Sequence, residues 1–170
     1  MMEIISERLK MRPLSLSDRE FFESLYTDPR VTQFCFDQPE PDEIEQKFQS
    51  RLYPWNSDSE HWLCLLISQK NSGEPVGITG FFLQDGIAEV GFLLSAAHHG
   101  RQFGTESLKA LIQWTVETCE ITAFQAVVTE GNIASERVLE KCGFELTEVE
   151  PDAYMIGGKL YADHLYTLIF

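Results

Sequence analysis

The sequence predicts an α+β fold in which a mixed, mainly antiparallel sheet of about seven strands is flanked by helices. Three observations predict it. Helical spacing of apolar residues marks the first third of the chain, three strand patterns joined by short turns follow, and strand and helix patterns alternate after Leu94. The 170 residues are 44% hydrophobic and no repeat or linker divides them, so we expect one domain spanning 1–170.

The first third of the chain is predicted to hold one strand and three helices. Glu7–Leu14 alternates as a strand does. Ser17–Glu20 has the form of a capping box and predicts a helix that continues to about Tyr26. A short helix is expected near Val31–Phe34. A longer one follows Pro41, because apolar residues then recur at i, i+4 and i+8: Ile44, Phe48 and Leu52.

The rest of the chain supplies the remaining strands and two more helices. Turn residues at 71–74 and 84–86 divide the middle into an antiparallel meander of three strands: Trp62–Ser68, Pro75–Leu83 and Ile87–Leu94. Beyond it, helical spacing predicts helices over Gly104–Cys119 and Ile133–Cys142. The strands expected there are Ala123–Thr129, Phe144–Glu148 and Leu165–Phe170.

The charge of the chain argues against nucleic acid and anionic membranes as partners. Acidic residues number 27 against 13 basic ones, for a formal net charge of −14. Neutralising phosphates requires clustered Lys and Arg, which an acidic domain lacks. Such a chain would attract amines, polyamines or Lys/Arg-rich proteins, although the same charge could also serve solubility alone.

The cysteines and histidines do not predict a metal site. The four cysteines are widely spaced, form no CxxC pair, and lie at ligand spacing from none of the four histidines. No disulfide scaffold is expected either. The first residues lack the basic and apolar regions of a signal peptide, and no apolar run could span a bilayer. We therefore expect a reduced, cytoplasmic protein.

The stretch His99–Glu106 is the most informative part of the sequence. It leaves a strand and enters a long helix, with Gly100 and Gly104 at the junction. A helix N-terminus favours a phosphate, and glycines let the backbone approach it closely, although glycine at such a turn often serves only the turn. The P-loop pattern GxxxxGK[ST] and the dinucleotide pattern GxGxxG are both missing.

Together with Glu89–Ser95 upstream and Asn132–Phe144 downstream, this stretch resembles the GNAT acetyltransferase superfamily. The likeness is strongest to its Rim-type branch, the ribosomal-protein N-terminal acetyltransferases, and it covers nearly the whole chain, from 6–9 to 163–166. It implies a GNAT fold across 1–170, whose splayed central strands hold CoA, and acetyl-CoA as the cosubstrate.

The resemblance also implies which residues hold acetyl-CoA. Backbone amides of the loop would bind the pyrophosphate, the strand before it would pair with the pantetheine arm, and Asn132 would contact that arm. The implied cofactor-binding residues are Phe92, Leu93, Leu94, His99, Gly100, Arg101, Gln102, Phe103, Gly104, Thr105 and Asn132.

The sequence departs from the family's pattern at three positions. Gln102 stands where the first glycine of the loop usually lies, and His99 stands where Gln or Arg is usual. Leu139 occupies the position at which many members carry a tyrosine general acid, a departure that the Rim-type branch shares. Glu89 is the candidate base and Ser135 the candidate proton donor to the departing thiolate; each could instead be structural.

Two segments, 22–53 and 152–163, are expected to flank the acceptor. Both are rich in acidic and aromatic residues, and acidic walls favour a cationic acceptor. The residues concerned are Asp37, Glu40, Asp42, Glu43, Tyr53 and Trp55 on one side, and Glu148, Glu150, Asp152 and Tyr154 on the other.

The sequence therefore predicts direct transfer of acetyl from acetyl-CoA to a primary amine, with a protein N-terminal α-amine best supported. The acceptor is then a cationic amine or a basic protein N-terminus, and no nucleic acid, membrane or metal takes part. A small amine such as an aminoglycoside or polyamine, or a catalytically silent acyl-CoA-binding module, remains an alternative. A monomer and a homodimer are both compatible with the sequence.

Overall fold

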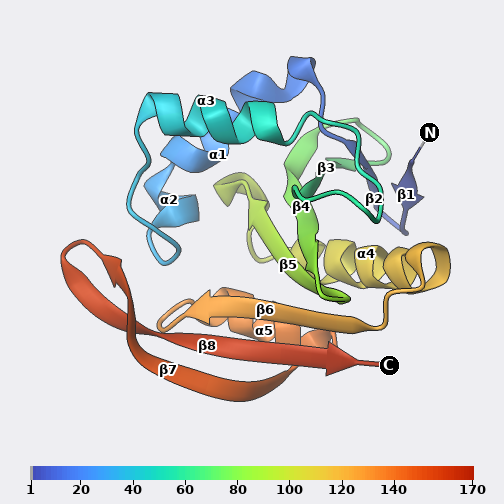
Figure 1. The fold of residues 1–170 in the computed structure, drawn as a ribbon. Helices are drawn as coiled ribbons and strands as arrows, with labels where there is room; N and C mark the ends of the chain where they lie inside the picture. The colour runs from blue at the N-terminus through green and yellow to red at the C-terminus, as the bar shows by residue number, and fades with distance from the viewer. Residues whose placement is uncertain (1) are drawn as a thin grey trace.

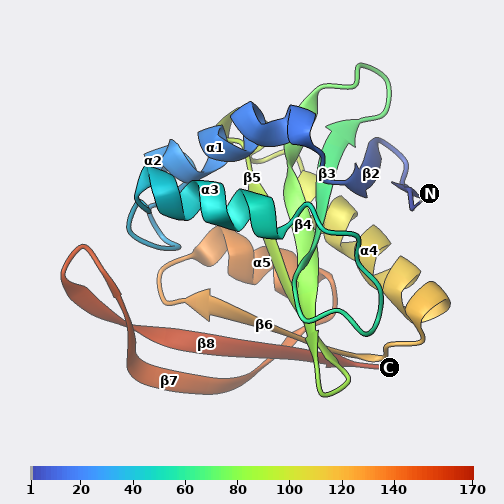
Figure 2. The ribbon, with the colours of Figure 1, turned by 45° about the horizontal axis from the view of Figure 1, so that its top comes forward.

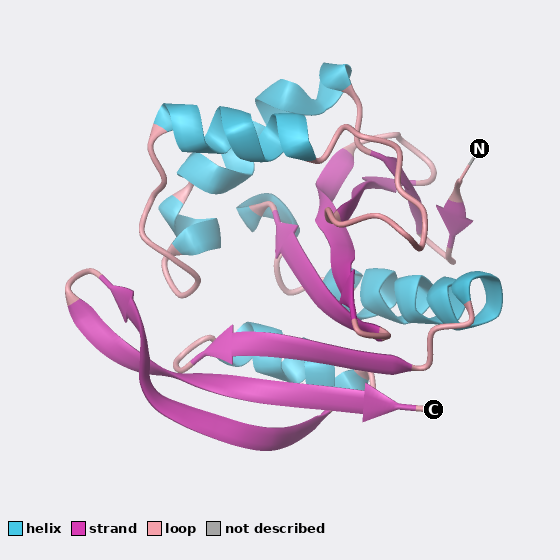
Figure 3. Ribbon diagram, viewed as in Figure 1, coloured by secondary structure: helices cyan, strands magenta, loops and turns pink. Residues whose placement is uncertain are grey.

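The computed structural model describes residues 2–170 (Figures 1 and 3). The strands are β1 Ile4–Ile5, β2 Leu9–Pro13, β3 Leu63–Gln69, β4 Pro75–Gln84, β5 Ile87–Leu94, β6 Ala123–Thr129, β7 Glu145–Ile156 and β8 Lys159–Ile169. The helices are α1 Arg19–Thr27, α2 Pro29–Thr32, α3 Pro41–Ser50, α4 Phe103–Cys119 and α5 Ile133–Lys141, with 3₁₀ turns at η1 Leu16–Asp18 and η2 Ala96–His98. Within residues 2–170, no helix has the length and apolar character needed to cross a bilayer.

All the strands belong to one eight-stranded sheet in the order β1-β2-β3-β4-β5-β6-β8-β7. Every neighbouring pair is antiparallel except β5 and β6, which are parallel. The α+β class with a mixed, mainly antiparallel sheet is thus confirmed, with β1 as the additional strand. The parallel pairing extends only from Ile87 to Glu89, after which β5 and β6 diverge (Figure 1). The rest of β5 therefore turns an open edge toward β6.

Helices cover both faces of the sheet (Figure 2). On one face, α1 and α3 bury Phe22 and Phe48 against Cys64 and Leu66 of β3. On the other face, α4 buries residues such as Leu108 among the alternate residues of β3, which are Leu63, Leu65 and Ile67. A strand that is apolar on both faces is expected where helices pack on each side of it.

Two predicted helix starts are wrong by about two residues. The capping box is formed by Ser15 and Asp18, and the Asp18 carboxylate accepts hydrogen bonds from Ser15 N (2.8 Å) and from the Arg12 guanidinium (2.8 and 2.9 Å). Asp18 thereby precedes α1, so the predicted box at Ser17–Glu20 does not form. The short helix begins at Pro29 because Asp28 caps it, accepting from Arg30 N at 3.0 Å.

The predicted strands Phe144–Glu148 and Leu165–Phe170, together with the segment 152–163 expected to flank the acceptor, prove to be one long hairpin, β7–β8. Every residue of β7 except the last is exposed, so no alternation of apolar and polar side chains marks the strand in the sequence. The pairing also shifts register between Glu150 and Tyr154, where Asp152 has a φ of 51°. These irregularities, together with Pro151, give the segment the appearance of a loop in the sequence.

Candidate active site

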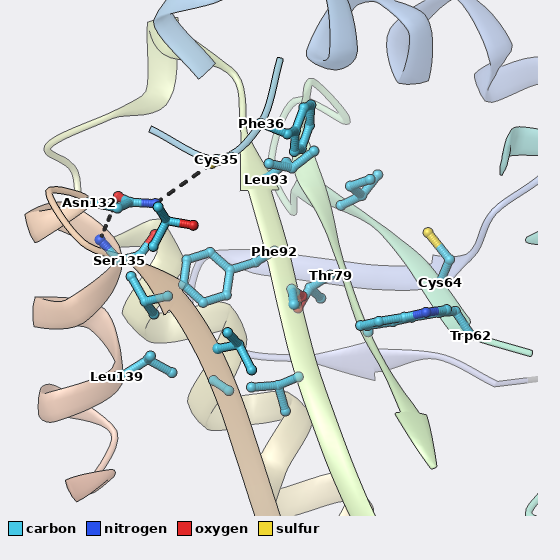
Figure 4. Close-up of a pocket in the computed structure, with 18 of the residues that line it drawn as sticks. Cys35, Phe36, Trp62, Cys64, Thr79, Phe92, Leu93, Asn132, Ser135 and Leu139 are labelled. Atoms are coloured by element: carbon cyan, nitrogen blue, oxygen red, sulfur yellow. Dashed lines mark hydrogen bonds between the residues drawn. The ribbon is translucent and has the colours of Figure 1, made fainter. Parts of the chain in front are cut away.

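Two cavities meet where β5 and β6 diverge. The first, here called the loop groove, has a volume of about 440 Å³ and lies between the N-terminus of α4, α5 and the α2 region. The second, here called the sheet pocket, has a volume of about 260 Å³ and extends between β3–β6 and the residues around α1–α3 (Figure 4). The two share six lining residues: Phe34, Cys35, Phe92, Leu93, Asn132 and Ser135. A ligand that fills the groove can therefore present one end to the pocket.

The N-terminus of α4 forms one wall of the loop groove. The first backbone bond of the helix runs from Glu106 N to Gln102 O (3.0 Å), so the preceding amides of the first turn point out of the helix end. Gly100 has a φ of 76° and open space where a Cβ would lie. These features leave room for an anion against exposed N–H groups.

Gln102 takes the left-handed conformation (φ 65°, ψ 15°) that normally favours glycine. Its side chain is directed to α5, where Oε1 accepts a hydrogen bond from Lys141 Nζ at 3.0 Å. The non-glycine residue thus keeps the backbone geometry of the loop. Its cost is backbone strain of about 1 kcal/mol.

The open edge of β5 forms the second wall, through Phe92, Leu93 and Leu94. The carbonyl of Gly91 accepts a hydrogen bond from Thr79 Oγ1 (3.0 Å), and the carbonyl of Leu94 lies 2.9 Å from His99 Nε2. These bonds hold the end of β5 in place beyond Glu89, where β5 no longer pairs with β6. The edge is positioned to pair with an extended, amide-bearing ligand.

Asn132 fixes the junction of the two cavities (Figure 4). Its Oδ1 accepts from Ser135 N (3.3 Å) and caps α5, while its Nδ2 donates to Cys35 Sγ (3.6 Å). Burial raises the pKa of the Cys35 thiol, although the bond from Asn132 opposes this change. The thiol is therefore neutral at pH 7, and the junction carries no charged side chain from these three residues.

Neither cavity is lined by an aspartate or a glutamate. The loop groove is lined by the cations Arg30, Arg137 and Lys141, and the one charged residue that lines the sheet pocket is Arg51. In a chain with a net charge of −14 this is a strong separation of charge. It suits a polyanionic ligand in the groove. Elsewhere in residues 2–170, no cluster of three or more His, Cys, Asp or Glu side chains is placed to hold a metal ion.

The structure brings most of the sequence-predicted site residues together. The loop groove is lined by Phe92, Leu93, Leu94, His99, Gly100, Gln102, Phe103, Gly104, Thr105, Asn132 and Ser135. Arg101 does not line it; its guanidinium lies 4.8 Å from the centroid of the buried Phe103 ring. Glu89 lines neither cavity, and its Oε1 accepts from Gln125 Nε2 of β6 at 3.1 Å. Its role as base stays a prediction.

The acidic residues expected to flank the acceptor lie outside both cavities. None of Asp37, Glu40, Asp42, Glu43, Glu148, Glu150 or Asp152 lines either one. Asp37 instead joins the segment after α2 to the tip of the β7–β8 hairpin, since its Oδ1 accepts from Gly157 N at 2.8 Å.

The cations that line the two cavities were not predicted from the sequence. Arg137 and Lys141 are spaced i, i+4 on the helix that Asn132 caps, so their shared face was available as a signal. Arg30 and Arg51 precede this helix by some eighty residues or more and carried no comparable signal.

Comparison with known proteins agrees with this geometry. The family described as Acetyltransferase (GNAT) domain matches residues 8–145. A Bacillus licheniformis relative, described as the uncharacterized N-acetyltransferase p20, is 24% identical over 169 residues, which are 98% of this chain and 95% of the relative. RimL, a ribosomal L7/L12 α-N-protein acetyltransferase solved with coenzyme A, superposes with a TM-score of 0.85 at 21% identity, covering 99% of this chain and 98% of its own.

A second solved structure shares the fold but has a different acceptor. The spermidine N-acetyltransferase of Vibrio cholerae, solved with CoA and spermine, has a TM-score of 0.83 at 15% identity and covers 96% of each chain. At such identities the two structures establish a common fold and leave the acceptor of this chain open. The family match, in contrast, spans most of the chain and includes the loop and the α5 segment that form the site. The protein therefore belongs to the GNAT acetyltransferase family and is an acetyl-CoA-dependent acyltransferase.

Proposed function

We propose that the protein transfers acetyl from acetyl-CoA to the N-terminal α-amine of a protein or peptide, by direct attack and without a covalent enzyme intermediate. The observation that carries the acceptor class is the lack of any carboxylate in the sheet pocket. Without a lining base, the amine has to arrive neutral. An α-amine, with a pKa of about 7.7–8.0, is partly neutral at pH 7.5, whereas a lysine-type amine with a pKa of about 10.4 is almost entirely protonated.

The loop groove fits the polyanionic cosubstrate. The amides at the N-terminus of α4 would hold its pyrophosphate, with Arg137 and Lys141 adding positive charge from α5. The open edge of Phe92–Leu94 would pair with the amides of the pantetheine arm. Bound in this way, acetyl-CoA supplies a thioester at the junction with the sheet pocket. Gly100 permits the close approach because nothing occupies the space in front of its Cα.

The residues at the junction serve orientation and proton transfer. The amine nitrogen forms the new C–N bond as the C–S bond of the thioester breaks, and the surplus amine proton passes to water. The Ser135 hydroxyl would donate a hydrogen bond to the departing sulfur, while Asn132 holds Ser135 in place through its backbone amide (3.3 Å). Leu139 is buried and apolar, so it keeps water away but donates no proton. Glu89 could take part only through an intervening water, because its carboxylate lies outside the pocket.

The proposal is tested by titrating acetyl-CoA calorimetrically and by measuring thiol release with a panel of amines between pH 6 and 10. We expect binding of acetyl-CoA, turnover with peptide α-amines, and a kcat/KM that stops rising above about pH 8, where an α-amine is neutral. The same peptide blocked at its N-terminus but carrying a free lysine is the control and should be a poor substrate. Equal rates for the blocked and free peptides would refute the acceptor class.

The same panel separates the two alternatives. The net charge of −14 favours a polyamine or aminoglycoside acceptor. Turnover of those amines without turnover of peptides would establish that alternative. Leu139, which cannot donate a proton, instead favours a silent acyl-CoA-binding module, for which acetyl-CoA would bind but no amine would be acetylated.

A further inference from the structure

Arg51 is the one charged residue that lines the sheet pocket, and it does so from the C-terminal end of α3. Its guanidinium carbon lies over the Trp62 ring, 5.2 Å from the ring centroid, within the range of a cation–π contact. Its Nη1 donates to the Tyr26 hydroxyl at 3.4 Å, and the group also contacts the Cys64 thiol. These contacts leave most of its five N–H donors without a partner among residues 2–170.

Within residues 2–170, Arg51 makes no ion pair, although the chain carries 27 acidic side chains. Four of the other six arginines are paired with carboxylates (Arg8–Glu106, Arg12–Asp18, Arg19–Glu45 and Arg30–Asp28), whereas Arg101 and Arg137 are not. A partly buried guanidinium without a carboxylate is costly unless a ligand supplies the anion.

Lys47 adds a second cation beside Arg51, one helical turn earlier in α3. Its Nζ lies 5.3 Å from the centroid of the Tyr26 ring, and Tyr26 lines the pocket. Burial lowers the pKa of Lys47 and the positive charge of Arg51 lowers it further, whereas the charge of Glu43 raises it. Lys47 therefore adds positive charge near Arg51 without lining the pocket itself.

The opposite end of the sheet pocket lies at the junction with the loop groove. Asn132 and Ser135 lie at one end of the view in Figure 4, and Trp62 and Cys64 lie at the other. The pocket therefore runs from an uncharged junction at Asn132 and Ser135 to the guanidinium of Arg51.

We propose that Arg51 is a specificity-determining residue and that the acceptor is an α-amino compound carrying a carboxylate, which binds Arg51 while its amine reaches Ser135. This inference rests on the proposed transfer to an α-amine and adds a carboxylate to the acceptor. The sheet pocket has a volume of about 260 Å³, so the part of the acceptor that enters it is small. The carboxylate could belong to a free amino acid or to an acidic residue near the start of a peptide, and assays with both kinds of acceptor distinguish the two sources.

The test compares acceptors that differ by one charge. Wild-type protein is assayed with peptides that carry Asp or Glu, or their amides Asn or Gln, at each of the first three positions, and with free amino acids against their C-terminal amides. We expect at least a tenfold higher kcat/KM for the charged member of one such pair, expressed mainly in KM. A preference among peptides identifies an acidic side chain, and a preference among free amino acids identifies an α-carboxylate.

Three variants then assign the preference to Arg51. Arg51→Met should reduce it to within about twofold by slowing only the charged acceptor, and Arg51→Lys should retain part of it. Arg19→Met is the matched control, because the Arg19 guanidinium also lies over an aromatic ring (5.0 Å from Phe48) but is paired with Glu45 and lines neither cavity.

The outcomes of these assays test the role of Arg51 and the proposed function separately. Equal rates for charged and amide acceptors in the wild type overturn the inference and leave the proposed function standing. A preference that survives in Arg51→Met also overturns it. Lack of turnover with every α-amine refutes the proposed function itself, and the inference with it. If Arg51→Met does not fold, Arg51→Gln provides the neutral variant, and the wild-type comparison still decides.

Discussion

Glu106 offers the sharpest test of how the start of α4 is held in place. Its carboxylate accepts hydrogen bonds from Ser6 Oγ (2.6 Å), Arg8 N (2.8 Å) and Arg8 Nε (2.7 Å), which ties the turn between β1 and β2 to the helix. The Glu106 side chain is 16% exposed, and that of Arg8 is 43% exposed. The perturbation is Glu106→Gln, which keeps the shape of the side chain and removes its charge.

The expected loss follows from these contacts. The bonds from Ser6 and from the Arg8 amide are worth about 1.5 kcal/mol each when the acceptor is charged, and the exposed ion pair adds less than about 1 kcal/mol. Glutamine retains one acceptor oxygen but turns an NH₂ group toward a donor. We therefore expect the free energy of unfolding to fall by about 2 kcal/mol at pH 7.

The direction of the pKa shift of Glu106 determines how this loss of stability depends on pH. Burial works against ionisation of Glu106, but the hydrogen bonds from Ser6 and Arg8 outweigh it and lower the pKa of the carboxyl group. The stability that Glu106 contributes is thus present above its unfolded pKa of about 4.3 and is lost as the pH falls through the lower folded pKa. The difference between wild type and Glu106→Gln should be full at pH 7 and shrink below about pH 4.

Urea denaturation from pH 3 to pH 7 measures this difference. Glu117→Gln is the matched control on the same helix, because Glu117 is exposed and accepts only from Gln113 Nε2 (3.1 Å). The control should change stability by less than about 0.5 kcal/mol. A loss in Glu106→Gln no larger than in the control, or a loss that persists unchanged at pH 3, would show that the charge of Glu106 does not hold the start of α4.

Two further predictions concern α5 and the loop before α4. Asn132→Ala removes the cap of α5 and should lower the free energy of unfolding by about 1 kcal/mol, whereas Asn132→Asp keeps an acceptor oxygen and should lower it less. Urea denaturation of both variants measures the two losses, and equal losses would mean that capping is not the cause. At position 102, Gly should be more stable than Ala by about 1 kcal/mol, because both variants lose the contact with Lys141 and only the backbone preference at φ 65° differs. An Ala variant as stable as the Gly variant, judged by thermal unfolding, would show that the loop relaxes.

Elements with a buried face could be predicted from the sequence with nearly correct bounds. β5 and β6 match their predicted ranges, and α4 differs by one residue, since each presents regular apolar residues to the core. β7 could not be predicted in full, because its exposed residues need no pattern and its pairing with β8 is bulged. Helix starts depend on single side-chain contacts such as that between Arg12 and Asp18, which sequence spacing does not reveal.

The candidate site likewise has one part that could be predicted from the sequence and one part that could not. The loop, Asn132 and Ser135 are close in sequence to recognisable helix starts, and the structure places them around one groove. The chemistry of the acceptor end depends instead on Arg51, Trp62 and Tyr26, which come from different elements. The total charge is visible in the sequence, but its partition between surface and cavities depends on tertiary packing.

That partition has a consequence for how the cosubstrate arrives. At distances well beyond the Debye length, which is about 8 Å at physiological salt, an approaching polyanion experiences little of the electrostatic field of the protein. At shorter distances it is first repelled by a chain with a net charge of −14. At the mouth of the loop groove, Arg137 and Lys141 then present positive charge, together with Arg30, which is paired with Asp28. Salt should therefore act oppositely on the two stages, speeding the encounter by screening the repulsive surface and weakening the complex once those cations hold the ligand.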